Sequence, residues 1–260
     1  MELGIKNKVA LVTASSRGIG KATAIALAKE GTHVAICARN IEKLQLVEKE
    51  IKQYGVECLS IQADVTDPER VRFIFETIQK KWDRLDILVN NAGGTLDSPS
   101  KNFEEVPVDF WNKIHDLNSG TAIRFTNLAI PMMRKNKWGR VVTISSKQGK
   151  EGGGMPWYTM TKSAEIAMMK TLAMKFELVR DGITFNSVAP GAILTEEGNW
   201  ADFRKKEPAK LEERLNSTFP LGRLGLVEEV ANVIAFLCSE NASLVNGACI
   251  PVDGAESKSY

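Results

Sequence analysis

Residues 8–20 read KVALVTASSRGIG and contain a strand, a tight turn and the start of a helix. The β-branched, apolar run of residues 8–13 predicts a buried strand, and residues 19–30 predict a helix that ends at Gly31. A turn at a helix N-terminus directs backbone N–H groups and the positive end of the helix towards an anion. Gly18 and Gly20 leave room for a pyrophosphate and for close packing of the helix on the sheet. This stretch therefore predicts an α/β fold with a dinucleotide site at its first turn.

The rest of the chain repeats this alternation of strand and helix. Strands are expected at residues 33–38, 57–62, 86–89, 140–144, 183–188 and 248–252, and helices at 41–54, 68–81, 108–135, from about 156, and 227–239. Such βαβ units have right-handed crossovers, which place helices on both faces of a parallel sheet. We therefore expect a Rossmann-type, doubly wound parallel sheet of about seven strands in a single domain, residues 1–260. Residues 194–224 interrupt the alternation and are expected to form a helical excursion that contributes the substrate loop.

The composition argues against several classes of function. A formal net charge of +2, without a long run of like charge, gives no indication of nucleic-acid binding. The sequence has neither a signal-peptide pattern nor an apolar run near 18 residues, so no membrane span is expected. The four cysteines form no CxxC pair and the two histidines lie far apart. We therefore expect a cytoplasmic protein with reduced thiols and no metal site.

The end of the second strand indicates which dinucleotide is bound. An NAD(H) site carries an acidic residue there to bind the ribose hydroxyls, whereas this chain has Ala38, Arg39 and Asn40. Arg39 and Arg17 could both reach a 2′-phosphate, which a guanidinium group binds with two parallel hydrogen bonds. The sequence therefore favours NADP(H) over NAD(H). The alternative is that Arg39 is a surface residue at the start of a helix.

Tyr158 and Lys162 lie four residues apart in a helical pattern, so their side chains share one face. A free phenol, with a pKa near ~10, exchanges protons poorly at neutral pH. An ammonium group ~4 Å away, at an effective dielectric of ~20, favours the phenolate by about 4 kcal/mol. That is enough to make a tyrosine a general acid or base. A half-buried tyrosine beside a solvated lysine is the alternative interpretation.

A series of short motifs resembles the classical short-chain dehydrogenase/reductase family over residues 5–254. The motifs are TASSRGIG at 13–20, ADV at 63–65, NNAG at 90–93, Asn118, ISS at 144–146, YTMTK at 158–162, APGAILTE at 189–196, PLGRLGLVEEVA at 220–231 and VNGACIPVDG at 245–254. The combination of NNAG, a serine and YxxxK at these separations is highly specific for that family.

The resemblance implies a reversible hydride transfer between NADPH and a carbonyl or alcohol substrate. Tyr158 would donate the proton to the carbonyl, and Lys162 would favour the phenolate and hold the nicotinamide ribose. Ser146 would bind the substrate oxygen, with Ser145 as the competing assignment. Asn118 would kink its helix and hold a water molecule in a proton relay to the lysine.

The resemblance also implies a set of cofactor contacts. They are Thr13, Ser15, Ser16, Arg17, Gly18, Ile19 and Gly20 in the first turn, Arg39 after the second strand, Asp64 and Val65 beside the adenine, Asn90, Ala92 and Gly93 along the channel, Tyr158 and Lys162 at the ribose, and Pro190, Gly191, Ile193 and Thr195 at the nicotinamide.

Two departures from the family pattern are expected to matter. Ala14 replaces the first glycine of the usual TGxxxGxG motif. A methyl group fits there without strain only if the backbone φ is negative, and otherwise phosphate affinity would be reduced. Trp157, directly before the tyrosine, suggests a wall of the substrate pocket; surface packing is the alternative.

Seven of the eight methionines lie between Met132 and Met174, three of them after Lys162 on one helix. Methionine provides adaptable apolar surface for a core or an interface. In similar proteins this helix packs against its twin, so a homotetramer is expected.

The substrate is not identified by the sequence. The nearest subgroup is that of the 3-oxoacyl-carrier-protein reductases, and a sugar or polyol dehydrogenase is the alternative. A basic cluster of Arg134, Lys135, Lys137 and Arg140 could meet an acidic acyl-carrier protein or form a solvated turn. A non-catalytic redox sensor is a third hypothesis. It is disfavoured because the catalytic residues of the family are all present.

Overall fold

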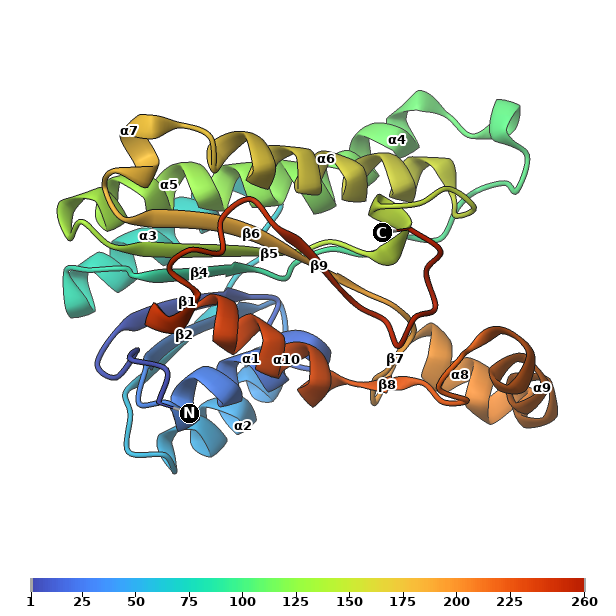
Figure 1. Ribbon diagram of the computed structural model, residues 1–260, viewed down its shortest axis with the longest axis horizontal. Helices are drawn as coiled ribbons and strands as arrows, with labels where there is room; N and C mark the ends of the chain where they lie inside the picture. The colour runs from blue at the N-terminus through green and yellow to red at the C-terminus, as the bar shows by residue number, and fades with distance from the viewer. Residues whose placement is uncertain (1, 260) are drawn as a thin grey trace.

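The computed structural model describes residues 2–259 and has one parallel sheet between two layers of helices (Figure 1). The strand order is β3-β2-β1-β4-β5-β6-β9, and every neighbouring pair in this sheet is parallel. The strands are β1 (Val9–Thr13), β2 (His33–Ala38), β3 (Cys58–Gln62), β4 (Ile87–Asn90), β5 (Gly139–Ile144), β6 (Ile183–Pro190) and β9 (Cys249–Val252). This architecture confirms the predicted Rossmann-type, doubly wound α/β fold. Residues 1 and 260 of the expected domain lie outside the described part of the chain.

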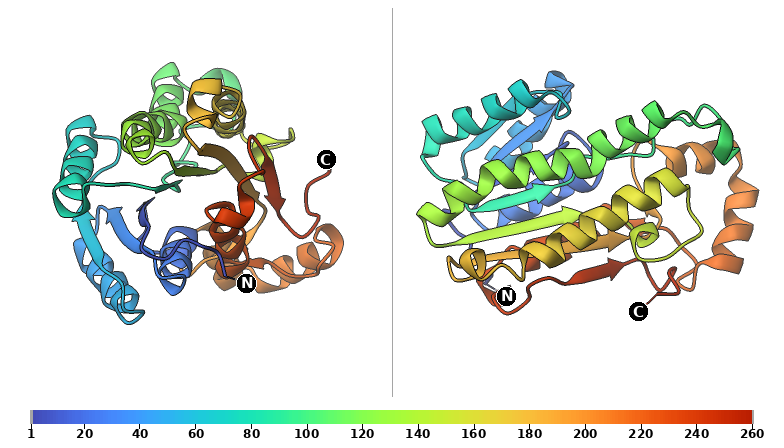
Figure 2. Two further views of the ribbon diagram at one scale, coloured as in Figure 1. Left: turned by 60° about the vertical axis from the view of Figure 1, so that its left-hand side comes forward. Right: turned by 90° about the horizontal axis from the view of Figure 1, so that it is seen from above.

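Helices cover both faces of the sheet, as the end-on view in Figure 2 shows. One layer holds α1 (Gly18–Lys29), α2 (Ile41–Lys52) and α10 (Val227–Leu237), and the other holds α3 (Pro68–Trp82), α5 (Thr121–Lys135) and α6 (Pro156–Leu172). The shorter helices are α4 (Val108–His115), α7 (Phe176–Val179), α8 (Asn199–Lys206) and α9 (Pro208–Thr218), with 3-10 turns at Phe103–Glu105, Lys147–Gly149 and Glu240–Ala242.

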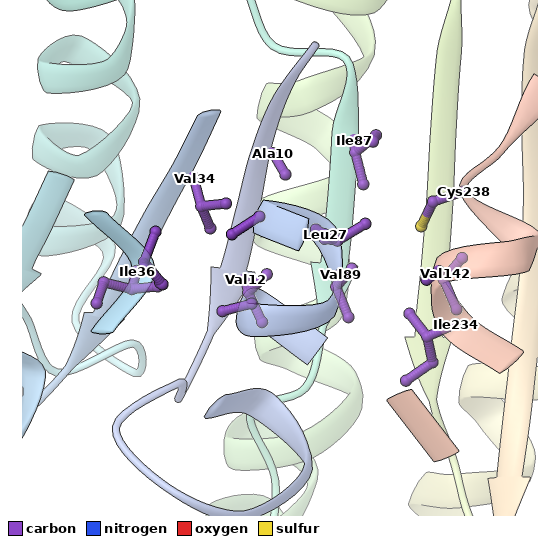
Figure 3. Packing of buried hydrophobic residues seen from close by; sticks show 14 of the residues in the cluster. Ala10, Val12, Leu27, Val34, Ile36, Ile87, Val89, Val142, Ile234 and Cys238 are labelled. Carbon is purple, nitrogen blue, oxygen red and sulfur yellow. The ribbon is translucent and has the colours of Figure 1, made fainter. Parts of the chain in front are cut away.

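The central strands β1 and β4 are buried along their whole length because the sheet is covered on both sides. Successive side chains of β1 point to opposite faces, so Ala10 and Val12 join one apolar cluster and Val9 and Leu11 the other. Figure 3 shows the first cluster, in which Leu27 of α1 packs against the strands. Two cores on opposite faces fix the sheet, and with it the position of each loop at its C-terminal edge.

The strand order reverses between β1 and β4. From β1 the chain runs outwards to β2 and β3, then returns to place β4 on the other side of β1. The loops that follow β1 and β4 therefore diverge and leave a crevice at the C-terminal ends of these strands. In open α/β sheets this crevice is the usual ligand position.

The helical region expected at residues 108–135 is divided. A π-helical segment, Asp116–Gly120, separates α4 from α5. It contains Asn118, which is fully buried. An extra residue per turn rotates the following side chains, and such segments occur frequently at functional sites.

Residues 194–224 form a helical projection at one end of the molecule (Figure 1). The short strands β7 (Ile193–Leu194) and β8 (Gly225–Leu226) pair in parallel at its base and carry α8 and α9 between them. Trp200 contacts Phe203 and Phe219 edge-on, which holds the two helices together. This segment has its own small core, separate from those of the sheet.

None of the helices in residues 2–259 is long and apolar enough to cross a membrane. Over the same residues there is no cluster of three or more His, Cys, Asp or Glu side chains that could hold a metal ion.

Candidate active site

The loop between β1 and α1 is fixed by buried hydroxyl groups. Thr13 Oγ1 accepts hydrogen bonds from the backbone N–H groups of Asn91 and Ala92, both at 2.9 Å. Ser15 Oγ donates to a β1 carbonyl at 2.7 Å and accepts from a β2 amide at 3.2 Å. Thr13 and Ser15, both expected to contact the cofactor, therefore use their side chains to join three strand ends. Gly18 follows with a φ of +57°, a conformation that favours glycine.

Ala14 does not have the negative backbone φ that would let an alanine replace this glycine without strain. Its φ is +50°, in the left-handed region where a Cβ atom costs on the order of 1 kcal/mol. The loop is held there by Asn91, whose Nδ2 donates to the carbonyls of Thr13 and Ala14 at 2.8 and 3.1 Å. The departure from the family motif is therefore accommodated by backbone strain in the phosphate-binding turn.

A cleft of about 820 Å³ opens at the C-terminal edge of the sheet beside β1 and β4. Most of the predicted cofactor contacts line it: Ser16, Arg17, Gly18, Ile19, Arg39, Asp64, Val65, Ala92, Gly93 and Thr195. Thr13, Ser15, Gly20 and Asn90 do not line it and are buried, and Asn90 Nδ2 is bonded to Thr126 and Thr143. Pro190 ends β6, Gly191 follows it and Ile193 begins β7; these three do not line the cleft either. Tyr158 and Lys162, predicted at the ribose, are likewise absent from its lining.

Three cations gather at the adenosine end of this cleft. Arg17, Arg39 and Lys43 all line it, together with Glu197 from the projecting segment. Glu197 forms ion pairs with Arg17 and, at 2.6 Å, with Lys43. Arg39 makes no ion pair with any residue of 2–259. Lys43 was not among the predicted contacts, although it lies four residues after Arg39 in the first turn of α2. Glu197 is too distant in sequence to be identified from spacing.

Lys162 and Asn118 meet beside Gly93 at the inner end of the cleft. A Cβ atom on Gly93 would lie 2.6 Å from Asn118 Oδ1 and 3.1 Å from Lys162 Nζ. Asn118 Oδ1 accepts from the Gly94 amide at 3.0 Å, and its Nδ2 donates to the carbonyl oxygens of Gly94 and Ile114 at 3.0 and 2.8 Å. Three predicted site residues from distant parts of the chain thus converge at one point.

The two serines after β5 have different environments. Ser145 is buried, and its hydroxyl donates to the carbonyl of Lys162 at 2.7 Å. Ser146 is half-buried, and its Oγ accepts from the Gln148 amide at 3.2 Å, which leaves its proton free to donate. The geometry therefore favours Ser146 over Ser145 as a donor to a substrate oxygen.

Tyr158 lies in the first turn of α6, beside an aromatic cluster. Lys162 Nζ is 5.8 Å from the centroid of the tyrosine ring. Trp157 is buried and packs edge-on against Phe110 and Trp111, at 5.7 and 5.8 Å between ring centroids. The alternative that Trp157 packs on the surface is therefore wrong, because the indole belongs to a core that anchors α6 to α4. Its role as a wall of the substrate pocket stays a prediction.

Lys162 also binds a carboxylate that the sequence analysis did not single out. Its Nζ donates to Ile144 O at 3.0 Å and to both oxygens of Glu165 at 3.0 and 2.9 Å. Both side chains are at most 4% exposed. Burial lowers the pKa of Lys162, but the charges of Glu165 and Tyr158 outweigh it and the net pKa is raised. Burial raises the pKa of Glu165 to about 7, against the opposing attraction of Lys162.

The C-terminal tail supports the loop that follows β6. Glu256 accepts from the Ala192 amide at 2.7 Å and pairs with Lys147 at 2.9 Å. Lys147 is the neighbour of Ser146, and Ala192 lies between Gly191 and Ile193. One nearly buried carboxylate therefore links the two loops.

Every cation of the basic cluster of residues 134–140 has a carboxylate partner, and two of them share one. Arg134 and Lys137 pair with Asp181, Lys135 pairs with Asp83, and the buried Arg140 pairs with Glu240. The cluster precedes or begins β5, so it lies at the N-terminal edge of the sheet, opposite the cleft. We therefore assign no carrier-protein docking to it.

Comparison with known proteins gives the family. The family model described as enoyl-(acyl carrier protein) reductase matches residues 13–255. The chain belongs to the short-chain dehydrogenase/reductase family. It is 38% identical over 256 residues to the 3-oxoacyl-[acyl-carrier-protein] reductase of Aquifex aeolicus, covering 98% of this chain and 99% of that protein. The corresponding reductase of Staphylococcus aureus is 36% identical over 249 residues, 95% of this chain and 97% of the other.

Solved structures of proteins of the short-chain dehydrogenase/reductase family support the same family assignment. L-sorbose reductase from Gluconobacter frateurii, complexed with NADPH and L-sorbose, superposes with a TM-score of 0.91 at 32% identity and full coverage of both chains. A 7α-hydroxysteroid dehydrogenase, complexed with NADH and 7-oxo glycochenodeoxycholic acid, gives 0.88 at 30% identity, covering 99% and 97%. The predictions of the family and of an oxidoreductase acting on CH–OH or C=O groups are confirmed.

Proposed function

We propose that this protein transfers a hydride reversibly between NADP(H) and a carbonyl or alcohol substrate at the C-terminal edge of its sheet. The observation that carries the proposal is the convergence of Lys162 and Asn118 on Gly93, which lines the dinucleotide-sized cleft, with the ring of Tyr158 beside Lys162. The cleft lies where open α/β sheets usually bind their ligands, outside the carboxyl ends of the strands at the point where the strand order reverses. A bound nicotinamide supplies the hydride.

The chain's own residues move the proton. Tyr158 donates a proton to the substrate oxygen in reduction and removes it in oxidation. Lys162, held by Ile144 O and Glu165, lies beside the tyrosine, with its Nζ 5.8 Å from the centroid of the tyrosine ring. Ser146 donates to the same substrate oxygen. Asn118 fixes the turn beside Gly94 and holds a water molecule in a proton relay to the lysine.

The cofactor is proposed to lie along the lined cleft. The start of α1 at Gly18 and Ile19 faces the pyrophosphate, while Asp64 and Val65 flank the adenine. Arg39, Arg17 and Lys43 bind the 2′-phosphate, with Arg39 the cation that has no carboxylate partner among the described residues. Pro190, Gly191, Ile193 and Thr195 form the nicotinamide end. The NADPH found with L-sorbose reductase supports this choice over NAD(H).

Two substrate classes are supported by specific relatives. The Aquifex and Staphylococcus proteins are named as reductases of 3-oxoacyl groups on acyl-carrier protein, whereas L-sorbose reductase acts on a sugar. We propose 3-oxoacyl thioester reduction first, because those relatives have the higher identity. A sugar or polyol is the second candidate. The projecting segment of residues 194–224, whose Thr195, Glu196 and Glu197 line the cleft, would select between them.

We also propose a cytoplasmic homotetramer. Met160 and Met174 of the α6 region are 43% and 68% exposed, and Phe176 is 73% exposed. Met160 lies on α6, Met174 lies beyond the end of that helix, where the sequence had placed it within the helix, and Phe176 begins α7. Exposed large apolar side chains near one another in this part of the chain are typical of an interface between subunits. Light scattering on purified protein would contradict this assembly if it gave the mass of a monomer at micromolar concentration.

Replacement of Tyr158 by phenylalanine tests the catalytic assignment. The variant keeps the ring and its packing but cannot transfer a proton, so turnover should be lost while NADPH binding is kept. Turnover is followed at 340 nm with acetoacetyl-coenzyme A and L-sorbose as probes, and binding by fluorescence titration. Unchanged turnover in Y158F would remove the tyrosine from the mechanism, and with it the proposed function.

Replacement of Arg39 by aspartate tests the cofactor. A carboxylate at this position repels a 2′-phosphate and accepts hydrogen bonds from ribose hydroxyls, so R39D should bind NADPH at least tenfold more weakly and NADH more tightly. Tighter binding of NADH than NADPH by the unmodified protein would refute the argument from charge.

A further inference from the structure

Glu165 is a buried carboxylate that the proposed mechanism does not use. It occupies α6 one turn after Lys162 and two turns after Tyr158, so the three side chains follow one face of the helix. The carboxylate is 1% exposed and binds Lys162 Nζ through both oxygens. A buried carboxylate is costly unless it is paired, and this one is paired with the proposed catalytic cation.

The lysine is held from two elements. Ile144 O at the end of β5 accepts one of its protons, and Glu165 accepts from the other side. No other charged side chain of residues 2–259 forms an ion pair with Lys162 or Glu165, and Tyr158 is the other ionisable group acting on the lysine. The site therefore contains three coupled groups, and a change of charge on Glu165 is felt by the other two.

We infer that Glu165 is a positioning residue for this reaction: it fixes the ammonium of Lys162 and sets the charge beside Tyr158, so that turnover depends on the ionisation of Glu165. The inference rests on the proposed function. With Glu165 ionised, the lysine–glutamate pair is neutral. With Glu165 protonated, the pair carries one positive charge, which makes it easier to remove a proton from the Tyr158–Lys162 couple.

The substitution Glu165→Gln mimics the protonated state at every pH. Carbonyl reduction requires that Tyr158 and Lys162 are both protonated, so the rate of reduction falls at alkaline pH once either residue loses its proton. Removal of a negative charge about 3 Å from Nζ should move this alkaline fall in kcat/KM to lower pH by at least about one unit. Because burial raises the pKa of Glu165 to about 7, the unmodified protein and E165Q should have similar profiles below pH 6 and diverge above pH 8.

The profiles are measured by NADPH oxidation at 340 nm, with acetoacetyl-coenzyme A or L-sorbose, whichever is reduced, from pH 5.5 to 9.5. Glu48→Gln is the matched control, because Glu48 pairs with Lys52 on α2, outside the residues that line the cleft. E48Q should keep the profile of the unmodified protein. Glu165→Met serves as a second variant if the buried amide impairs folding, since methionine removes the charge at similar volume without a polar group.

A downward shift of the alkaline limb in E165Q or E165M, absent in E48Q, supports the inference. The inference is overturned if the alkaline fall in kcat/KM does not move, if it moves to higher pH, or if the rate is lost uniformly at all pH values. Glu165 would then be a purely structural partner of Lys162. The two proposals fail separately. Unchanged turnover in Y158F removes the proposed function, whereas loss of turnover in Y158F with an unmoved limb in E165Q removes only the role of Glu165.

Discussion

Gly93 and Gly94 provide a matched pair of substitutions to alanine at the centre of the site. At Gly93 the new Cβ atom would meet Asn118 Oδ1 at 2.6 Å and Lys162 Nζ at 3.1 Å, both closer than ordinary contacts. At Gly94 the nearest atom to the new Cβ would be Leu117 Cδ2 at 3.9 Å. Neither glycine has a positive φ, so backbone strain is not a difference between the two variants.

The cost at Gly93 follows from the hydrogen bonds of Asn118. To avoid the methyl group, the amide must rotate away from three partners, the amide and carbonyl groups of Gly94 and the carbonyl of Ile114. At about 1 kcal/mol for each bond, G93A should be destabilised by roughly 2–3 kcal/mol. For a domain of this size that lowers Tm by roughly 4–10 °C. If the lysine moves instead, a displacement of about 1 Å should reduce kcat by about 100-fold.

Thermal unfolding of the cofactor-free proteins and kcat at saturating NADPH measure both effects. Both glycines line the cleft, so a change in cofactor affinity alone would not distinguish the variants. We expect G94A to retain the Tm of the unmodified protein to within about 2 °C and G93A to lose both stability and turnover. Equal Tm and kcat for G93A and G94A would refute the convergence of Asn118, Lys162 and Gly93 on which the site is built.

Two further predictions concern the phosphate end of the cleft. Glu197→Gln releases Arg17 and Lys43 from exposed ion pairs, so NADPH should bind roughly three- to tenfold more tightly at low salt while NADH is unaffected; weaker NADPH binding in a fluorescence titration would contradict this. Ala14→Gly relieves the left-handed backbone at φ +50° and should raise Tm by roughly 1–3 °C; a lower Tm would show that Ala14 is not strained.

The sheet could be predicted because local signals and global packing agree. The strand predicted at residues 33–38 is β2, and the strand predicted at 183–188 is β6 extended by two residues. Asp67 before Pro68 predicted a helix start, and Asp67 Oδ1 accepts from the Glu69 amide at 2.9 Å. A β-branched run with turn residues on both sides has few alternatives once both faces of the sheet are covered.

The site was less predictable where its geometry depends on contacts across the fold. The cofactor contacts of Thr13 and Ser15 stay predictions, but their hydroxyls join strand ends, a role that sequence spacing does not reveal. The pairing of Glu197 with Arg17 spans 180 positions. The backbone φ of Ala14 is set by Asn91 from another loop. The motif alone therefore could not tell whether this φ is positive or negative, and only the folded structure decides it.

Glu165 shows what spacing can and cannot reveal. The interval of three residues from Lys162 places it on the catalytic face, and that signal was present in the sequence. Whether such a carboxylate is solvated or buried depends on what covers the helix, and here α6 packs onto the sheet so that Lys162 reaches Ile144 O. A solvated glutamate would ionise near its ordinary pKa and merely pair with the lysine, whereas burial raises the pKa to about 7. The same two residues at the same spacing would therefore be a static ion pair on a surface helix, whereas buried beside Tyr158 they form the pair that we infer makes proton transfer sensitive to pH near 7.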